Sequence, residues 1–483
     1  MKRLVVGPFN RVEGDLELTL DIEDGAIAAA RVTTPLYRGF EQLLVGRPAA
    51  DALVIAPRIC GICSVSQSLA AATALRALGR VDPARNGVIA ANLAHAAENI
   101  ADHLTHFYIF FMPDFARADY SGRPWFEKTE QRFKAIRGSA SADVLPARAR
   151  LLEIMGLLAG KWPHSLAFQP GGTTRAVDLG EKMRLIAILA EFRSFLESRL
   201  FAAPIENILA IADSGALDDF ASGPAADGDF AAFIRIARDL RLDNLGNLDV
   251  PLMSFGAYHD LERPLLAGGV YDRSANRASR LPGEAIAEDV AFSWMRETAD
   301  DPFFAETIPH ADKAGAYSWA KAPRLAGRPA EVGAVARQAV DGHPLIRALL
   351  DDRGGSNVFV RVVARVLEIA RLVQACEGWA RNLRLSEPFC ADAPRADDGR
   401  AVAMVEAARG ALGHWMIVRN GRIHRYQIIA PTTWNFSPRD REGRPGPVER
   451  ALEGVEVGAR GARAASVQHV VRSFDPCMVC TAH

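Results

Sequence analysis

Apolar residues recur at helical spacing through the middle of this chain and alternate with polar residues near its two ends. Spacings of three and four residues predict helices, and strict alternation predicts half-buried strands. Long helices are predicted at residues 64–78, 86–111, 146–160, 177–201 and 356–384. A shorter helix is predicted at 462–473. Gly79 is expected to cap the first helix and Pro113 to stop the second. Residues 214–345 show only weak periodicity.

Two hairpins are predicted, one near each end of the chain. Alternation from Leu16 to Ile22 and the turn residues Asp24-Gly25 predict a hairpin over residues 11–34. Asn420-Gly421 is a strong hairpin turn, followed by a strand at 422–429. We therefore expect one domain over residues 1–483, mainly α with α+β portions. It would contain the first hairpin, a helical core at about 62–385, and a C-terminal hairpin and metal-binding segment at about 402–483.

Composition narrows the class of protein. The 483 residues are 49% hydrophobic with a formal net charge of −1, so no basic field favours nucleic acid or an anionic membrane. No apolar run approaches the roughly 18 residues of a membrane span, and the first residues lack the apolar stretch of a secretory signal. Six cysteines are too few for a disulfide scaffold, which predicts a reducing, cytoplasmic location.

Four of the six cysteines form two C-x-x-C pairs, Cys60 with Cys63 and Cys477 with Cys480. Two such turns brought together would supply four thiolates, which select nickel, zinc, copper(I) or iron. A structural zinc site is the simplest interpretation, although its pairs are usually much closer in sequence. A separation of over 400 residues favours a buried centre between two segments of a large domain. The other two cysteines are expected to be ordinary small residues.

The helix predicted at 86–111 carries a polar stripe at His95, Asn99, Asp102 and His106. We interpret His95 and Asn99 as facing solvent. Asp102 precedes a strongly apolar run and is a candidate buried, functional carboxylate. A further polar loop at 160–172 is rich in turn residues and is a candidate docking surface.

Eight short motifs occur in order along the chain, and together they resemble those of the large subunit of nickel–iron hydrogenases. They are R-V-E-G at 11–14, R-G-F-E at 38–41, R-x-C-G-x-C at 58–63, D-H-x-x-H-F-Y at 102–108, G-K-x-P-H at 160–164, A-R-G-A-L-G-H at 408–414, A-P-T-T-W-N at 430–435 and D-P-C-x-x-C-x-x-H at 475–483. The resemblance displaces the zinc interpretation. It implies that family's fold, a central bundle of long helices with small β-hairpins from both chain ends.

The resemblance also implies a set of metal ligands. Cys60 and Cys477 would be terminal thiolates on nickel, and Cys63 and Cys480 would bridge it to an iron that carries carbon monoxide and cyanide. The residues that would pack against and hydrogen-bond a cyanide are Pro431 and Thr432. A magnesium site would be formed by Glu41, the backbone carbonyl of Ile428 and His483.

Four further residues would serve catalysis by the same resemblance. Glu13 corresponds to the acid that accepts a proton from a cysteine ligand. Arg409 corresponds to the guanidinium held over the open metal site, with Asp102 and Asp475 as its partners. The implied reaction is heterolytic cleavage of H2. Because no spare set of cysteines could hold a cluster, electrons would leave through iron–sulfur clusters in a separate small subunit, in a heterodimer or a dimer of heterodimers.

Several departures from the family pattern resemble its regulatory, hydrogen-sensing branch. Gln67 stands where most members have histidine, and Ile62 and Phe110 stand where smaller residues line the gas channel. Ala408 replaces a common proline, and the sequence ends at His483, where most precursors of the family continue into an extension that a protease removes. We expect the bulky pair to hinder dioxygen more than dihydrogen, which would make the protein oxygen-tolerant.

Two functions remain open after this comparison, and Gln67, Ile62 and Phe110 favour the first of them. The first is a slow H2 sensor that signals to a histidine kinase and so regulates hydrogenase genes. The second is an energy-conserving uptake hydrogenase that feeds electrons to a quinone or another acceptor. The non-catalytic relatives in respiratory complex I lack the cysteines, which argues against a third, non-catalytic role.

Overall fold

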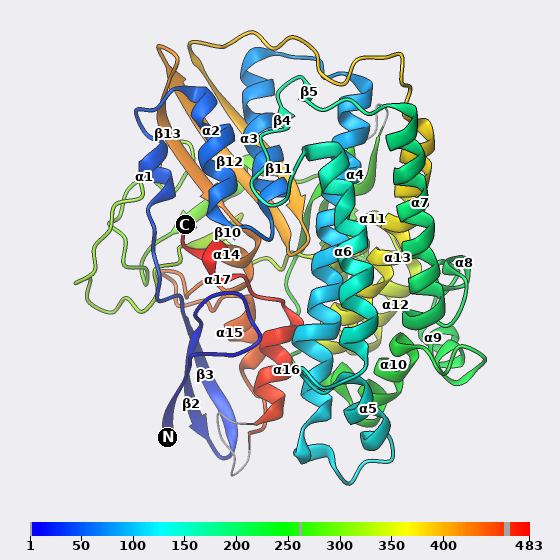
Figure 1. The fold of residues 1–483 in the computed structure, drawn as a ribbon. Helices are drawn as coiled ribbons and strands as arrows, with labels where there is room; N and C mark the ends of the chain where they lie inside the picture. The colour runs from blue at the N-terminus through cyan, green and yellow to red at the C-terminus, as the bar shows by residue number, and fades with distance from the viewer. Residues whose placement is uncertain (1, 260–262, 458–463) are drawn as a thin grey trace.

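A bundle of long helices forms one side of the molecule (Figure 1). The computed structural model describes residues 2–259, 263–457 and 464–483. Helix α4 packs against α6 and α13, and α7 packs against the same two helices. The bounds of these helices are α4 (Arg85–Thr105), α6 (Ala140–Ala159), α7 (Leu179–Phe195) and α13 (Val358–Asn382). Small sheets complete the fold, which confirms the expected mainly α class with α+β portions.

The helix ends differ from the predictions. In α3 (Ser64–Gly79), Gly79 is the last helical residue, and Arg80 adopts the left-handed conformation that ends the helix. The stretch after α4 continues as the π-helical η3 (His106–Phe111) and the 3-10 turn η4 (Met112–Ala116), whose first turn accommodates Pro113. Helix α6 begins six residues before Pro146, because Ala140 and Val144 are buried in the core. Helix α7 also ends in a π turn, η6 (Leu196–Leu200).

Each end of the chain forms an antiparallel three-stranded sheet. The first contains β1 (Lys2–Val6), β2 (Glu17–Glu23) and β3 (Ala26–Thr33), so the predicted hairpin is present but its first strand begins only at residue 17. The second contains β11 (Gly399–Ala407), β12 (Gly410–Arg419) and β13 (Arg422–Ile429), with Asn420-Gly421 at the turn as predicted. Strands β1 and β11 were not predicted.

The weakly periodic middle of the chain is well structured. Its strands are β6 (Leu252–His259), β7 (Pro264–Asp272), β8 (Arg277–Ser279), β9 (Ile286–Asp289) and β10 (Ala322–Leu325). Its helices are α9 (Ser214–Ser222), α10 (Asp229–Asp239) and α11 (Ala334–Asp341), while α8 (Ile205–Leu209) and α12 (Pro344–Arg353) lie at its two edges. Strand β6 is buried along nearly its whole length, so no alternation of polar and apolar residues marks it.

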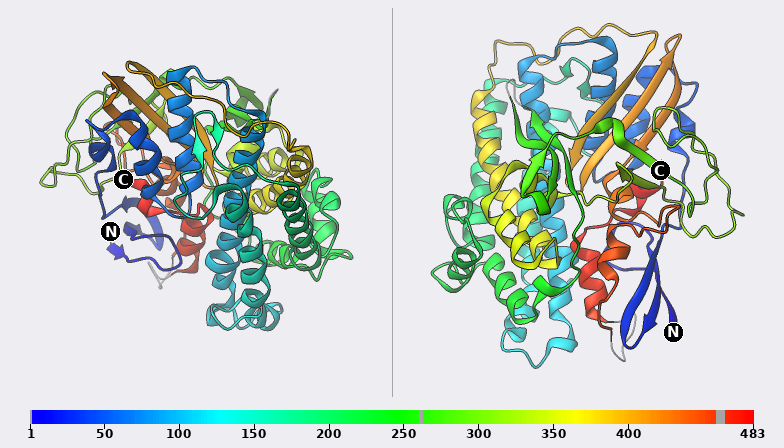
Figure 2. Two further views of the ribbon diagram at one scale, coloured as in Figure 1. Left: turned by 45° about the horizontal axis from the view of Figure 1, so that its top comes forward. Right: turned by 180° about the vertical axis from the view of Figure 1, so that it is seen from behind.

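The remaining helices bring the chain ends together. Figures 1 and 2 show the C-terminal helices between the N-terminal strands and the bundle. These helices are α14 (Pro431–Asn435), α15 (Pro447–Leu452), α16 (Ala465–Ser473) and α17 (Met478–Thr481); the predicted start of α16 at 462 lies outside the described residues. The shorter elements are α1 (Phe40–Leu44), α2 (Ala52–Ile55), α5 (Phe126–Phe133), β4 (Phe168–Gln169) and β5 (Gly172–Thr173). None of the described helices is both long and apolar enough to cross a membrane.

Candidate metal centre

Four buried thiols meet where α3 and α17 begin. The Cys60 and Cys477 sulfurs are 3.6 Å apart, those of Cys63 and Cys480 are 3.2 Å apart, and those of Cys477 and Cys480 are 3.3 Å apart. None of these cysteines is in a disulfide, and each is at most 9% exposed. The fold therefore brings together the four cysteines that the sequence singled out.

The sulfur spacing fits a shared metal. Thiolates bound about 2.3 Å from one metal ion lie roughly 3.3–3.8 Å apart, which is close to the spacing found here. Soft thiolate donors suit nickel or iron and not magnesium or calcium. The buried cluster would also exclude bulk water from whatever metal it holds.

Both cysteine turns are held by polar contacts, from the exposed to the fully buried. Arg38 donates hydrogen bonds to the carbonyls of Ile59, 2.6 Å away, and Val479, so one guanidinium links the two turns. On the other side, the Glu98 carboxylate accepts hydrogen bonds from the backbone N–H groups of Val65 and Ser66 at the start of α3. The sequence reasoning assigned no role to Arg38 or Glu98.

Glu13 lies beside the second cysteine turn. Its backbone pairs with that turn, donating to Pro476 O at 3.3 Å and accepting from the Met478 N–H at 2.7 Å. The side chain is half-buried, and its carboxyl interacts electrostatically with Arg409, Cys60 and Asp475. Burial raises the pKa of its carboxyl, and the charge of Arg409 opposes that shift. Glu13 can therefore contact both solvent and the interior.

Arg409 is buried at the turn between β11 and β12 and carries two carboxylate partners. Its Nη1 is 2.9 Å from Asp102 Oδ2, and its Nη2 donates to Asp475 Oδ1 at 3.1 Å. Its Nε also donates to the Asp475 carbonyl at 2.8 Å. Burial opposes the charge, but the two carboxylates outweigh it and raise the pKa of the guanidinium. A buried cation is tolerable only with such partners.

The residues expected near a cyanide lie at the start of α14. Pro431 is the first residue of this helix, and the hydroxyl of Thr432 accepts a hydrogen bond from Cys477 N at 3.2 Å. The neighbouring Thr433 donates to the Thr481 carbonyl at 2.9 Å. Helix α14 is thus tied directly to the second cysteine turn.

The expected magnesium ligands also come together. His483 Nε2 is 2.9 Å from Ile428 O and 3.6 Å from Glu41 Oε1. Lys321 lies between carboxylates, 3.1 Å from Glu288 and 3.4 Å from Glu41. A carboxylate, a carbonyl and an imidazole fit a hard cation. Lys321 and Glu288 come from the weakly periodic middle of the chain, which carried no signal for this site.

Three of the departures from the family pattern, at Gln67, Ile62 and Phe110, lie in different surroundings. Gln67 is fully buried on α3, and its Oε1 is 2.9 Å from His414 Nε2. Its side-chain N–H2 has no acceptor within the described parts of the chain. Ile62, in the first cysteine turn, is half-buried, as is Phe110 in the π-helical η3.

One sequence interpretation is wrong. His95 and Asn99 do not face solvent, being 4% and 1% exposed. His95 Nε2 lies 3.2 Å from the Ser66 hydroxyl, and Asn99 donates to the Tyr258 hydroxyl at 2.6 Å. The polar stripe of α4 faces other elements of the core, so it was mistaken for a solvated face. Asp102 is buried, as expected.

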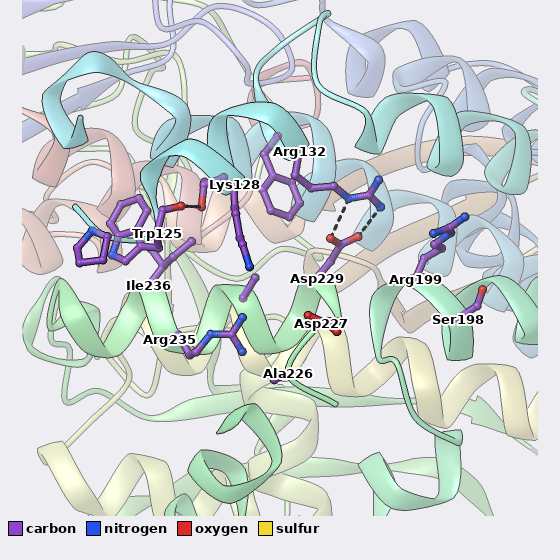
Figure 3. Close-up of a pocket in the computed structure, with 14 residues that line it drawn as sticks. Trp125, Lys128, Arg132, Ser198, Arg199, Ala226, Asp227, Asp229, Arg235 and Ile236 are labelled. Carbon is purple, nitrogen blue, oxygen red and sulfur yellow. Dashed lines mark hydrogen bonds and ion pairs between the residues drawn. The ribbon is translucent and has the colours of Figure 1, made fainter. Parts of the chain in front are cut away.

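A cleft of about 580 Å³ opens between α5, η6 and α10, and none of the residues discussed above lines it (Figure 3). Arg132 forms a two-point ion pair with Asp229 at its wall, and Lys128 and Arg235 point into it. The cationic cleft has no soft donor that would hold the same metal as the thiols.

Fold and thiol cluster define a large metalloprotein subunit with a buried sulfur-ligated centre. The model of the nickel-dependent hydrogenase family matches residues 38–119 and 120–483. The chain belongs to this family and is a hydrogenase large subunit.

The similarity to known proteins extends over the whole chain. It is 28% identical to the periplasmic [NiFeSe] hydrogenase large subunit of Desulfomicrobium baculatum, covering 100% of this chain and 95% of the relative. It is 26% identical to the quinone-reactive Ni/Fe-hydrogenase large chain of Wolinella succinogenes, covering 100% and 96%. The reduced Ni-Fe-Se hydrogenase of D. vulgaris Hildenborough superposes with a TM-score of 0.83 at 28% identity, with both chains fully covered.

Proposed function

We propose that this hydrogenase subunit oxidises H2 as part of an uptake enzyme that passes electrons to a quinone or another acceptor. The observation that carries the proposal is the meeting of four free, buried thiols from turns 417 residues apart. The name of the quinone-reactive relative supports the uptake direction over the sensing role expected from the sequence.

Within this proposal, the cysteines hold a nickel–iron centre. Cys60, Cys63, Cys477 and Cys480 would hold a nickel–iron centre whose iron carries carbon monoxide and cyanide, and Pro431 and Thr432 would line its pocket. When bound, this centre supplies the chemistry that splits H2 heterolytically. Glu41, the Ile428 carbonyl and His483 hold magnesium, which would fix the chain end in the core.

The side chains around the thiols handle charge and protons. Glu13 receives the proton released from H2 and passes it outward, which its half-buried position supports. Arg409, fixed by Asp102 and Asp475, places a positive charge in the dry interior beside the thiols. Fixed charge in a water-excluded site is worth far more than the same charge in water.

Electrons require a partner subunit that carries iron–sulfur clusters. Within the described residues, the two cysteines outside the thiol cluster are Cys376, buried in α13, and the exposed Cys390. We place the docking surface at residues 160–172. There Trp162 donates to Glu98 at 3.0 Å, and His164 Nδ1 lies 2.8 Å from Pro57 O, so the loop covers the first cysteine turn. A deletion in this loop that leaves the heterodimer intact would remove the basis for this surface.

The sensor remains a second candidate, because three residues favour it. Gln67, Ile62 and Phe110 match the pattern of the regulatory branch. In this second proposal the protein turns over slowly, tolerates oxygen, lies in the cytoplasm and binds a histidine kinase. Slow turnover together with H2-dependent binding of a kinase would select the sensor. Fast turnover with quinone reduction would select the uptake enzyme.

The deciding experiment uses the complex purified with its small subunit. We expect nickel and iron in the metal analysis, carbon monoxide and cyanide bands in the infrared spectrum that shift under H2, and H2-dependent dye reduction. Cys480→Ser should lose the nickel, the infrared bands and the dye reduction, whereas Cys390→Ser should lose none of them. Zinc in place of nickel, with a blank infrared spectrum, would refute the proposal.

A further inference from the structure

Arg337 on α11 is 0% exposed, and its guanidinium uses all five of its N–H donors. Two go to Glu368, at 3.0 and 2.6 Å. Nη1 donates to Glu406 at 2.7 Å and to the Ala407 carbonyl at 2.8 Å. Nη2 also donates to the Ala408 carbonyl at 2.9 Å. A guanidinium so fully bonded fixes the geometry of every group around it.

Three of these acceptors are consecutive residues that lead directly to Arg409. Strand β11 ends at Ala407 and β12 begins at Gly410, so Ala408 and Arg409 form the connecting turn. The turn also rests on the start of α11, because a Cβ at Gly410 would lie 2.6 Å from Gly333 N. Arg337 and the first turn of its helix therefore hold the backbone from which the Arg409 side chain extends.

The Arg337 guanidinium is also connected, through Glu368, to Asp102, the ion-pair partner of Arg409. Glu368 Oε1, which binds Arg337, lies 3.1 Å from His103 Nε2. His103 follows Asp102 on α4, and Asp102 forms the ion pair with Arg409. The buried Arg337 guanidinium is thus connected to both Arg409 and Asp102. It reaches Arg409 through the β11–β12 turn, and it reaches Asp102 through Glu368 and His103.

We propose that Arg337 is a positioning residue that sets the place of the Arg409 guanidinium relative to the thiols and Asp102. It touches neither the thiols nor Arg409's own side chain, so it acts only through the turn and through Glu368. The role in catalysis rests on the proposed function. The mechanical role, in which Arg337 holds residues 406–408, does not depend on it.

Arg337→Lys is the direct test, since lysine keeps the charge but cannot supply five donors in a fixed plane. Arg324→Lys is the matched control. Arg324 is also buried and donates to Asp440, Ser437 and three backbone carbonyls, none of them in the 406–409 segment. Both variants are made in the complex with the small subunit, and nickel per complex is measured for each.

Amide hydrogen exchange of the peptide that spans residues 402–412 reports the turn without any need for activity. We expect Arg337→Lys to speed exchange there by at least about 10-fold. The kcat for H2 oxidation per nickel should fall about 10–100-fold, as for partners that orient metal-site residues, with little change in KM. Arg324→Lys should change neither value, although it lowers thermal stability.

Unchanged exchange in the turn, or a loss of activity that merely follows lost nickel, would overturn the proposal. If Arg337→Lys fails to fold, Glu406→Gln replaces it. Glu406 Oε1 accepts from Phe255 N at 2.7 Å, so the amide of a glutamine would face Arg337 with its N–H2 and break that contact alone. A wild-type complex without H2 oxidation would refute the proposed function, while the exchange measurement would still decide whether Arg337 holds the turn.

Discussion

His414 illustrates how single residues around the thiols are constrained. Burial lowers the pKa of its imidazole to about 3, so the ring is neutral. Gln67 Oε1 can only accept, which makes His414 Nε2 the donor and leaves Nδ1 to accept from the Tyr426 hydroxyl, 2.8 Å away. Gln67 therefore fixes the tautomer of His414, a role that its place in the sequence did not reveal.

Gln67→Leu should destabilise the protein because it leaves the His414 Nε2–H without an acceptor in the core. A buried unsatisfied donor costs about 1–3 kcal/mol. The exposed Gln42 donates to the Thr307 carbonyl at 2.9 Å, and Gln42→Leu serves as the control with little effect. Thermal unfolding of both variants checks this. Equal unfolding temperatures for the two would contradict it.

At this scale the sequence singled out the candidate ligands but not the residues that support them. The four cysteines, Asp102 and Arg409 lie in recognisable motifs, and all are buried near one another. Arg337 and Lys321 lie in the weakly periodic middle of the chain, and nothing local marks them. Their roles arise from contacts between residues far apart in sequence, which a single sequence does not encode as a pattern.

Among the elements, the β11–β12 turn is closely packed. Gly410 has φ +131°, a backbone conformation that residues with a Cβ rarely adopt. Since α11 lies against it, the turn cannot move aside without shifting Gly333. Position and conformation of the turn are thus set by packing and by backbone geometry together.

Gly410→Ala should cost about 1–3 kcal/mol from backbone strain alone, and it should lower H2 oxidation because Arg409 shifts. Gly378 in α13 has open space around its Cβ position, so Gly378→Ala is the control and should be neutral or slightly stabilising. Unfolding temperature and specific activity are measured for both. Full activity and stability in Gly410→Ala would show that the turn is not constrained in this way.

Glu449 joins α15 to β3, accepting from Val32 N at 2.9 Å and from the Tyr317 hydroxyl at 2.8 Å. Burial raises the pKa of its carboxyl from 4.5 to about 7, against the opposing effect of these hydrogen bonds. A raised carboxyl pKa stabilises the fold below pH 4.5, and that contribution is lost as the pH rises through 7.

Glu449→Gln keeps both acceptor contacts but cannot ionise. The wild type should therefore lose about 3 kcal/mol relative to the variant between pH 4.5 and pH 8. Unfolding free energies of both proteins across this range provide the test. A difference that does not change with pH would mean that folding leaves the pKa of Glu449 unshifted.

Element by element, the sequence placed helices and hairpins well where one face is buried. Strand β6, buried on both faces, gave no alternation. The prediction that His95 and Asn99 face solvent was wrong because polar side chains can face a polar interior as readily as water. Periodicity in the sequence reflects the difference between the buried and the exposed face of an element. It carries no information for an element whose faces are equally buried.

For the whole molecule, the thiol cluster joins segments from opposite ends of the sequence. Metal bound only by the folded protein stabilises it by about 2.7 kcal/mol at a concentration 100 times its Kd. We expect the metal-loaded complex to unfold at a higher temperature than the metal-free one, and its C-terminal helices to resist proteolysis longer. Cys480→Ser should abolish both differences and Cys376→Ser neither. Equal behaviour of loaded and metal-free protein would exclude this coupling.

The separation of the two cysteine turns in the sequence also means that they are synthesised at different times. Cys477 follows Cys60 by 417 residues. A ribosome that adds roughly 5–20 residues per second takes about 20–80 seconds to cover that distance. Throughout this interval the first pair of thiols exists without the second, and α3 has no partner turn. Nascent chains interrupted between residues 63 and 477 carry only the first pair of thiols, so the cell must keep this pair from other metals and oxidants until the second pair has been made.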